Sequence, residues 1–369
     1  MSEQSDQQPR LLIFATQGTG HGDELRIVEL TSKLSPQLFP FNRASKKASF
    51  RQLLSTLKRE RPTLVIMEGT GIAGGAALIL ARTLYGVHYV VSSGDAIAPF
   101  LSMKKPLLGP IFRAYERWLY RLSSGFIGWT PYLVGRALTM GSPRGMTAAG
   151  WAPWSKTDAE LAAGRARVRA QWNIPDDAVV FGIVGSLDWN DRVQFCYGSE
   201  LVRAAVLAKR ADLRVLIAGD GSGMQHLRQL AGDELGRTII LTGRVPREQV
   251  IDYLAAMDAG SLPQSVDGVG SFRYTIKLSE YLAARLPTVT GEIPLAYDLN
   301  DGWFWRLPGD SPWDPRYIRA LADLMRTISL QQINDKRGRV PRELNVFDRT
   351  SQIERTTQFI GDICAALRA

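Results

Sequence analysis

The sequence predicts an α/β protein built from two domains, each a parallel sheet covered by helices. The chain has 369 residues, which is more than one hydrophobic core usually serves. Short apolar runs alternate with amphipathic stretches along almost the whole chain, and this rhythm is typical of parallel sheets. The first unit of the pattern is a strand at 11–16, a glycine-rich turn and a helix that starts near Leu25.

The same rhythm sets the other elements and the domain boundary. Further strands are predicted at 64–67, 88–91, 126–130, 179–184, 215–219, 239–243 and 259–263, with one more after Pro287. Helices are predicted at 73–84, 104–122, 156–171, 248–257, 276–286, 315–330 and about 350–367, and the segment 331–343 is expected to be a connection. We place the N-terminal domain at 1–155, joined by the last helix at 350–369, and the C-terminal domain at 156–349.

Composition narrows the class of protein. Hydrophobic residues make up 45% and charged residues 22%, as in ordinary globular proteins. The longest apolar runs, such as 74–81, are too short to span a bilayer, and the polar, loosely held start at 1–10 predicts no secretory signal. Two cysteines fit a reducing compartment, so we expect a cytoplasmic protein, with a peripheral position at the inner membrane face left open as an alternative. Three histidines without a Cys/His cluster argue against a protein-built zinc site, and no metal or other cofactor is expected.

The chain is basic, with a net charge of +9. Positive potential suits a phosphorylated substrate, an anionic lipid surface or nucleic acid. Nucleic acid ranks last because the chain contains no recognisable nucleic-acid module, and we expect no nucleic-acid partner. The helix at 104–121 interleaves arginines with bulky apolar residues, which suits either an anionic membrane surface or, more simply, a core-facing helix with a solvated basic back.

The most informative stretch is 274–289. Apolar residues at near-helical spacing predict a short helix that begins near Ile276 and leads into an inner strand. A helix N-terminus offers unpaired amides to a phosphate. Glu280, about one turn further, could accept hydrogen bonds from a ribose diol. A core helix with a solvated Lys277 and Glu280 explains the pattern equally well.

Several polar residues follow predicted strands, where ligands of open α/β sheets bind. The turn with Gly18, Gly20 and Gly22 permits a close backbone approach, and His21 in it could contact a sugar or phosphate. Glu68 and Asp95 also stand at strand ends. The plainer alternatives are a structural turn, an exposed loop histidine and a helix cap at Asp95.

The residues Lys277-Leu278, Glu280-Tyr281, Ala283 and Pro287 resemble the signature of glycosyltransferase family 4. Two glycine turns, at Gly185 and Gly219, resemble further segments of that family. The resemblance implies a GT-B fold, in which two Rossmann-like αβα domains face each other across a cleft and the last helix packs back on the N-terminal domain. It also implies retaining transfer of a sugar from a nucleotide-sugar donor to a hydroxyl of a sugar, glycan or lipid-linked acceptor, as in polysaccharide or glycolipid assembly.

The resemblance implies a role for each matched position. Glu280 would bind the ribose, Lys277 and Arg192 the diphosphate, and the Gly18–Gly22 loop would close on donor and acceptor. Asp95 would orient the acceptor hydroxyl or act as a base, with His21 close by. The remaining predicted donor-binding positions are Gly185, Gly219, Arg244 and Val245, where the backbone would read the base, and Asp267 and Ser271 in the loop before the helix.

The chain departs from the family pattern at Phe272, Ser186, Asp191 and Gly94. Two alternatives to a transferase therefore stay open. One is a nucleotide-sugar 2-epimerase of the same fold, which would use carboxylates or a histidine such as Glu68, Asp95 and His21 for acid/base chemistry. The other is a binding or scaffold protein that has lost catalysis.

Overall fold

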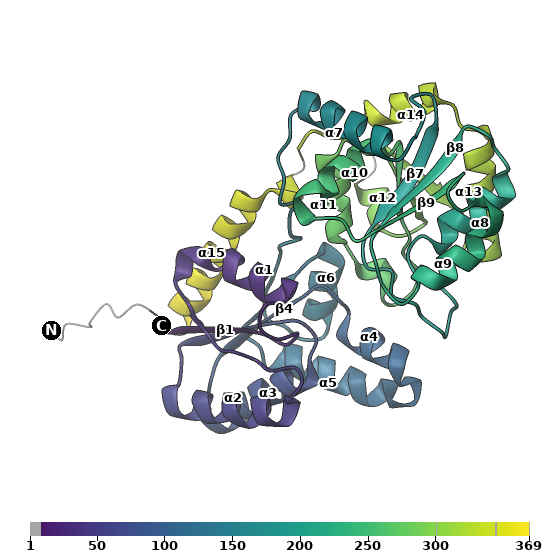
Figure 1. Ribbon diagram of the computed structural model, residues 1–369. Coiled ribbons are helices and arrows are strands. Elements are labelled where there is room, and N and C mark those ends of the chain that lie inside the picture. The colour runs from purple at the N-terminus through teal and green to yellow at the C-terminus, as the bar shows by residue number, and fades with distance from the viewer. Residues whose placement is uncertain (1–8, 300, 344, 369) are drawn as a thin grey trace. The chain divides into compact units, whose positions relative to one another are not determined.

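The computed structural model describes residues 9–299, 301–343 and 345–368, and the chain divides into two compact units (Figure 1). Unit 1 comprises residues up to Gly150, the short return 272–274 and the segment from Asn345 onward. Unit 2 comprises 151–271 and 275–344. Each unit has its own hydrophobic core. Most of the polar start predicted at 1–10 lies outside the described residues.

Unit 1 is built on a six-stranded parallel sheet in the order β2-β1-β3-β4-β5-β6. The strands are β1 Leu11–Ala15, β2 Gln37–Leu38, β3 Leu64–Glu68, β4 Tyr89–Ser93, β5 Gly125–Gly128 and β6 Gly145–Thr147. The strands β1, β3, β4 and β5 are buried throughout because helices cover both faces of the sheet, which explains their unbroken apolar runs.

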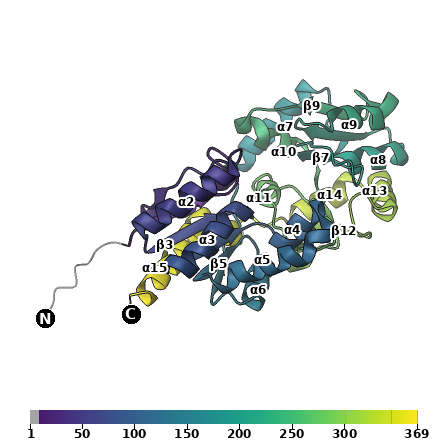
Figure 2. The ribbon, with the colours of Figure 1, turned by 90° about the horizontal axis from the view of Figure 1, so that it is seen from below.

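The helices of unit 1 form two layers. They are α1 Gly22–Leu30, α2 Lys46–Glu60, α3 Ile72–Tyr85, α4 Ile97–Lys104, α5 Gly109–Arg121, α6 Pro131–Thr139 and α15 Arg349–Ala366. Helices α2, α3 and α5 lie on one face, as the view from below in Figure 2 shows, and α1 and α15 lie on the other (Figure 1).

The last helix, α15, packs on α1 within unit 1. The side-chain amide of Gln352 is buried and bonds both backbone groups of Gly150, at 2.8 and 3.0 Å. Ion pairs Lys33–Glu354 and Arg349–Glu29 flank this contact. The predicted return of the last helix to the first half of the chain is confirmed.

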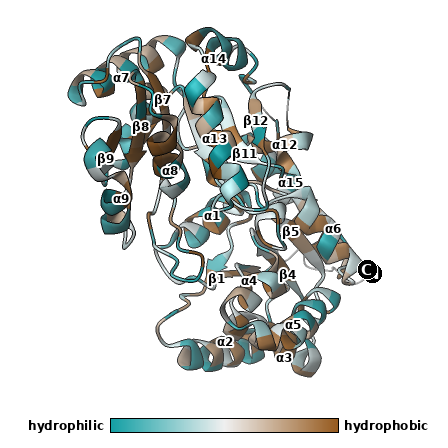
Figure 3. Ribbon diagram, turned by 90° about the vertical axis from the view of Figure 1, so that its right-hand side faces the viewer, coloured by the Kyte–Doolittle hydropathy of each residue, from teal (hydrophilic) through white to brown (hydrophobic). Residues whose placement is uncertain are grey.

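Unit 2 has a second six-stranded parallel sheet, in the order β12-β11-β10-β7-β8-β9. Its strands are β7 Val179–Val184, β8 Leu213–Ala218, β9 Ile239–Gly243, β10 Ala259–Leu262, β11 Thr288–Gly291 and β12 Phe304–Leu307. Its helices are α7 Asp158–Gln171, α8 Ser199–Ala208, α9 Met224–Ala231, α10 Val250–Ala256, α11 Ile276–Ala283, α12 Leu295–Asp298, α13 Pro315–Thr327 and α14 Leu330–Arg337. Strands β7 and β8 are almost wholly hydrophobic, whereas surrounding helices such as α9 and α14 carry hydrophilic residues (Figure 3).

Two local predictions were wrong. The predicted connection 331–343 contains most of α14, whose start is marked by a capping box between Ser329 and Gln332. The basic helix predicted at 104–122 begins only at Gly109, as α5, and a 3-10 turn that starts at Pro106 precedes it.

No described helix is both long and apolar enough to cross a membrane.

Candidate functional site

In unit 2 the loops that follow β7 and β8 meet at two of the predicted glycines. The Gly185 amide donates to the carbonyl of Ala218 at 3.0 Å. A Cβ atom built on Gly219 would lie 1.9 Å from the Gly185 carbonyl oxygen, so only glycine fits there. The two turns therefore leave bare backbone at the carboxyl edge of the sheet, where ligands of such sheets bind.

Lys277 lies across this bare backbone. Its Nζ would be 2.7 Å from a Cβ placed on Gly185, so a side chain there would displace the ammonium group. Nζ also lies 4.8 Å from the centre of the Tyr197 ring, which provides a cation–π contact. The sequence placed Lys277 at the start of a helix, and the structure adds that its charge reaches the β7 turn.

Glu280 stands three residues further along α11, on the same face as Lys277. Its side chain is half-buried, and its carboxylate accepts no hydrogen bond from any described residue. Burial raises the pKa of Glu280 above its usual value, while the charges of Lys277 and Arg247 act in the opposite direction. A partly desolvated acceptor without a partner, within the influence of two cations, is suited to accept hydrogen bonds from ligand hydroxyls.

Arg247 was missed by the sequence reasoning. It begins the short 3-10 turn Arg247–Gln249 after β9, three residues beyond the predicted Arg244. The available signal was the cluster of two arginines just after a strand end. Arg244 itself is exposed, and Val245 beside it is half-buried.

Arg192 lies in the exposed loop between β7 and α8, where its amide donates to Asn190 Oδ1 at 3.1 Å. This loop is held by Trp189, whose ring stacks on His226 at 3.9 Å and whose amide bonds Ser222. Ser186, at a position where the family carries a cation, donates to Asp188 instead.

Asp267 organises its own loop. Its Oδ1 accepts from the amides of Val269 and Gly270, both at 2.8 Å, and its carbonyl accepts from the Ser271 amide. These contacts form an Asx-type turn, which is a common loop-building role for aspartate. Asp267 and Ser271 therefore lie together in one turn, and no described contact joins them to Glu280.

Behind these loops a fully buried carboxyl group, Glu200, supports the sheet. It accepts from the Gly198 amide at 3.0 Å and from Ser261 Oγ at 2.7 Å. Burial raises its pKa to about 7. No sequence feature pointed to this group, because it lies in an ordinary amphipathic helix, α8.

In unit 1 the predicted glycine loop borders a cavity of about 740 Å³. Gly18 and Gly20 have φ values of 100° and 80°, which favour glycine, and the Gly20 amide donates to Glu24 at 2.9 Å. Gly22 is the first residue of α1, and His21 is exposed just before it. The cavity is lined by Gln17, Gly18, Thr19, His21, Pro40, Phe41, Asn42, Arg43, Ala44 and Lys46.

Two of the strand-end carboxylates in unit 1 already have partners. Buried Glu68 binds Arg26 at 2.5 Å and accepts from the Trp129 indole at 3.1 Å. Asp95 pairs with Arg273 at 2.6 Å, and both side chains are about a quarter exposed. The cap alternative for Asp95 is wrong, since the residue before α4 is Ala96 and Asp95 turns to Arg273 instead.

Asp23 is the carboxylate that the sequence reasoning missed. It lies in the first turn of α1, one residue beyond the glycine loop. Burial and the neighbouring charges of Glu68 and Asp95 raise its pKa to about 6, against the lowering effect of Arg26. From sequence, an acidic residue there is indistinguishable from one that complements the helix dipole.

No three His, Cys, Asp or Glu side chains of the described residues come together as a metal site would require. The positive charge beside the Gly185 turn of unit 2 comes from a side chain of the protein, that of Lys277.

Comparison with known proteins agrees with this arrangement. Residues 8–148 match the model described as a glycosyl transferase 4-like domain, and residues 178–314 match glycosyl transferases group 1. A search of curated proteins found no match. The fold resembles several solved structures of low sequence identity.

Sucrose-phosphate synthase from Thermosynechococcus elongatus superposes with a TM-score of 0.68 at 12% identity, over 97% of this chain and 100% of that one. HepE from Anabaena in complex with UDP-glucose gives 0.65 at 13% identity, over 96% and 100%. A trehalose-phosphate synthase from Burkholderia xenovorans in complex with glucose-6-phosphate gives 0.61 at 13% identity, over 96% and 100%.

The two domain matches, one in each unit, and the shared fold place the chain in the GT-B superfamily of glycosyltransferases.

Proposed function

We propose that the protein is a retaining, family 4-type glycosyltransferase that takes a sugar from a nucleoside-diphosphate sugar held by unit 2. The observation that carries this proposal is Glu280, a partly buried carboxylate without a hydrogen-bond partner among the described residues, on which the charges of Lys277 and Arg247 act. Glu280 would accept hydrogen bonds from the ribose diol, and the two cations would face the diphosphate. The complexes of HepE with UDP and UDP-glucose make a uridine nucleotide the first donor to test.

The chemistry of unit 2 would be electrostatic. As the sugar departs, negative charge grows on the diphosphate, and a preorganised cation lowers the free energy of that state more than it lowers the ground state. Lys277 already lies over the Gly185 turn, so it would need little rearrangement. No metal is needed in this proposal.

Unit 1 would supply the acceptor side. The cavity beside the Gly18–Gly22 loop is of a size suited to a small ligand. Asp23, with its pKa of about 6, would be mostly ionised at neutral pH and could take the proton of an acceptor hydroxyl. Asp95 would act through its pair with Arg273, and Glu68 through its pair with Arg26, as positioning residues.

An anionic membrane surface is the proposed location of the acceptor. Helix α5 buries Phe112 and Leu119, but Leu107, Ile111 and Trp118 are 97%, 62% and 57% exposed. Exposed Lys105, Arg113, Arg117 and Arg121 share this region. Apolar side chains flanked by cations complement the headgroup region of anionic bilayers.

The test of function is a screen of UDP, GDP, ADP, dTDP and CMP and their common sugar conjugates by thermal shift. Ligand at about 100 times its dissociation constant should add about 2.7 kcal/mol to the free energy of unfolding. The responding sugar nucleotide is then incubated with and without phosphorylated sugars and lipid extracts. Turnover that needs an acceptor supports the transferase, turnover without one favours the epimerase, and binding without turnover favours the non-catalytic alternative.

The membrane surface has its own test. Wild-type protein should co-sediment with vesicles of phosphatidylglycerol and phosphatidylcholine at low salt, and Leu107→Glu with Trp118→Glu should release it. Exposed Leu84→Glu on α3 is the matched control. Equal sedimentation of all three proteins would contradict this surface.

A further inference from the structure

Unit 2 contains a cavity of about 460 Å³. Gly185, Lys277 and Glu280 are not among its lining residues. It lies among α7, the end of α10, the residues that follow α11, and α14. Four arginines line it, namely Arg165, Arg285, Arg337 and Arg342, and Asp158 is the carboxylate among the lining residues. Because arginines outnumber carboxylates in its lining, the cavity favours binding of an anion.

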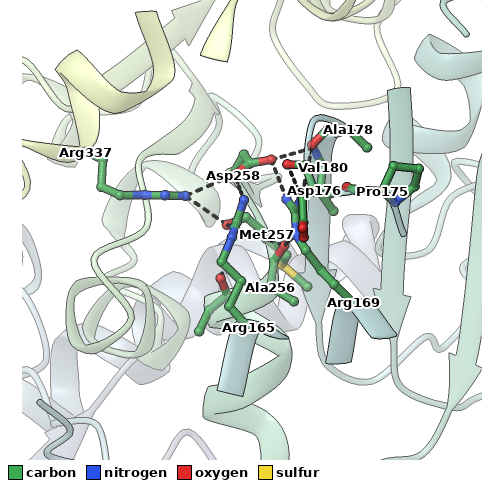
Figure 4. Close-up of polar contacts among 11 residues, drawn as sticks. Arg165, Arg169, Pro175, Asp176, Ala178, Val180, Ala256, Met257, Asp258 and Arg337 are labelled. Atoms are coloured by element: carbon green, nitrogen blue, oxygen red, sulfur yellow. Dashed lines mark hydrogen bonds and ion pairs between the residues drawn. The ribbon is translucent and has the colours of Figure 1, made fainter. Parts of the chain in front are cut away.

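One wall of the cavity rests on an unbalanced ion cluster around Asp258 (Figure 4). Arg165 and Arg169 each approach a carboxylate oxygen of Asp258 at 2.8 Å, and Arg337 approaches at 3.2 Å. Asp258 is only 1% exposed, and its Oδ2 also accepts from the Val180 amide at 2.8 Å. Three guanidinium groups thus share one buried carboxylate, and two positive charges have no counter-charge within the cluster.

Part of this cluster has a structural role. Arg169 is almost fully buried, and it donates to the carbonyls of Ala256 and of the turn before β7. Arg165 donates to the last carbonyls of α10, where a cation is favoured by the helix dipole. Arg337 is different, since within the described part of the chain only its Nη2 makes hydrogen bonds. Arg337 lines the cavity, so its other N–H groups are available to a ligand bound there.

The other two lining arginines, Arg342 and Arg285, approach Asp158. Arg342 Nη2 pairs with Asp158 Oδ2 at 2.9 Å, and Arg285 Nε approaches Asp158 Oδ1 at 3.8 Å. Arg285 Nε is buried and makes no hydrogen bond, which is a costly state for a charged donor. Asp158 therefore offsets one of these two charges.

We propose that this cavity binds a phosphorylated small molecule carrying at least two negative charges, at a site separate from the nucleotide-sugar site. Guanidinium groups bind phosphate oxygens in pairs, and the cavity has room for a phosphorylated sugar. Bound phosphates would supply the counter-charge that Asp158 and Asp258 leave incomplete. Arg285 lies two residues beyond the end of the short helix α11, which carries Lys277 and Glu280, so the ligand would also restrain that helix at its end.

The test uses inorganic pyrophosphate as the probe and the full chain with Lys277→Ala, which weakens binding at the nucleotide-sugar site. Calorimetry at low salt should still show pyrophosphate binding. Adding Arg342→Glu, a change at an exposed position, should weaken that binding at least tenfold. Adding Arg326→Glu, at an exposed position on α13 outside the cavity, should leave it unchanged.

Two results would overturn the proposal. One is absence of pyrophosphate binding once Lys277 is replaced, which would assign all binding to the nucleotide-sugar site. The other is equal affinity in the Arg342→Glu and Arg326→Glu proteins. If Arg342→Glu changes the circular dichroism spectrum, Arg342→Gln replaces it, with a smaller loss of at least threefold expected. Because uridine nucleotide binding is measured separately in the Lys277 wild-type protein, failure here leaves the proposed transferase function intact.

Discussion

The two units differ in what their carboxylates contact. In unit 2 the predicted Glu280 has no hydrogen-bond partner among the described residues, and the charges of Lys277 and Arg247 act on it. In unit 1 the strand-end carboxylates Glu68 and Asp95 are each paired with an arginine, and the unpredicted Asp23 has a pKa raised to about 6. In unit 2 the predicted carboxylate is therefore free to accept hydrogen bonds from a ligand. In unit 1 both predicted carboxylates are held in ion pairs, and Asp23 is the carboxylate with a raised pKa.

The largest expected effect concerns Asp23. If it takes the acceptor proton, Asp23→Asn should lower kcat by about 100-fold or more while nucleotide affinity stays unchanged. The wild-type rate should fall as pH drops below about 6, because the acting form of Asp23 is the ionised one. Steady-state kinetics from pH 5 to 8 check both effects. A full rate in Asp23→Asn would show that Asp23 does not take the acceptor proton.

The next effect concerns the buried carboxyl group of unit 2. The folded pKa of Glu200 is raised from 4.5 to about 7, so the fold favours its neutral form. Its contribution to stability is complete below about pH 4.5 and is lost as pH rises through about 7, a change of about 3 kcal/mol. Glu200→Gln should flatten this dependence. Urea unfolding at pH 5 and pH 8 measures it, and an unchanged slope in the variant would show that Glu200 is ionised in the fold.

The next effect concerns Glu280 as the nucleotide-binding carboxylate of unit 2. Glu280→Ala should weaken binding of the responding nucleotide by about 1–3 kcal/mol, since a charged hydrogen bond to the ribose is lost. Glu248→Ala, at an exposed position in the same region, is the matched control. Calorimetry should show this loss of affinity for the nucleotide, but only a small loss for its 2′,3′-dideoxy analogue, which lacks the ribose diol. Equal affinity in a folded Glu280→Ala protein would remove the main site assignment.

Lys277 should have a smaller and more selective effect. Lys277→Ala should reduce affinity for the nucleoside diphosphate by about 1–2 kcal/mol and leave nucleoside affinity unchanged, because the proposed role of the ammonium group is to bind phosphate. The difference should shrink as salt is raised. A parallel loss with the nucleoside would mean that Lys277 shapes the pocket instead of binding phosphate.

The smallest expected effect is that of a chelator. Lys277 and Arg247 supply the positive charge in the proposed site, so EDTA should leave the transfer rate unchanged within error. Restoration of a lost rate by Mg²⁺ or Mn²⁺ would contradict this expectation.

The sequence by itself determined the features that depend on local spacing. Alternating apolar runs are sufficient to predict two parallel sheets, because a strand buried on both faces and a helix with one apolar face have different periods. The pair Lys277 and Glu280 was also readable, since three residues in a helix place two side chains on one face. Gly185 and Gly219 were identified through the family resemblance, and the close approach of their turns explains why glycine is needed at Gly219.

Only the tertiary structure decided which side chains face each other across long stretches of chain. Arg273 comes back to Asp95 in unit 1, and Arg337 joins Arg165 and Asp258 in unit 2, over separations that no sequence period encodes. The pKa of Asp23 likewise depends on burial and on charges from other strands. Ionisation and pairing are set by desolvation and by distances through space, so they emerge only when the chain has folded.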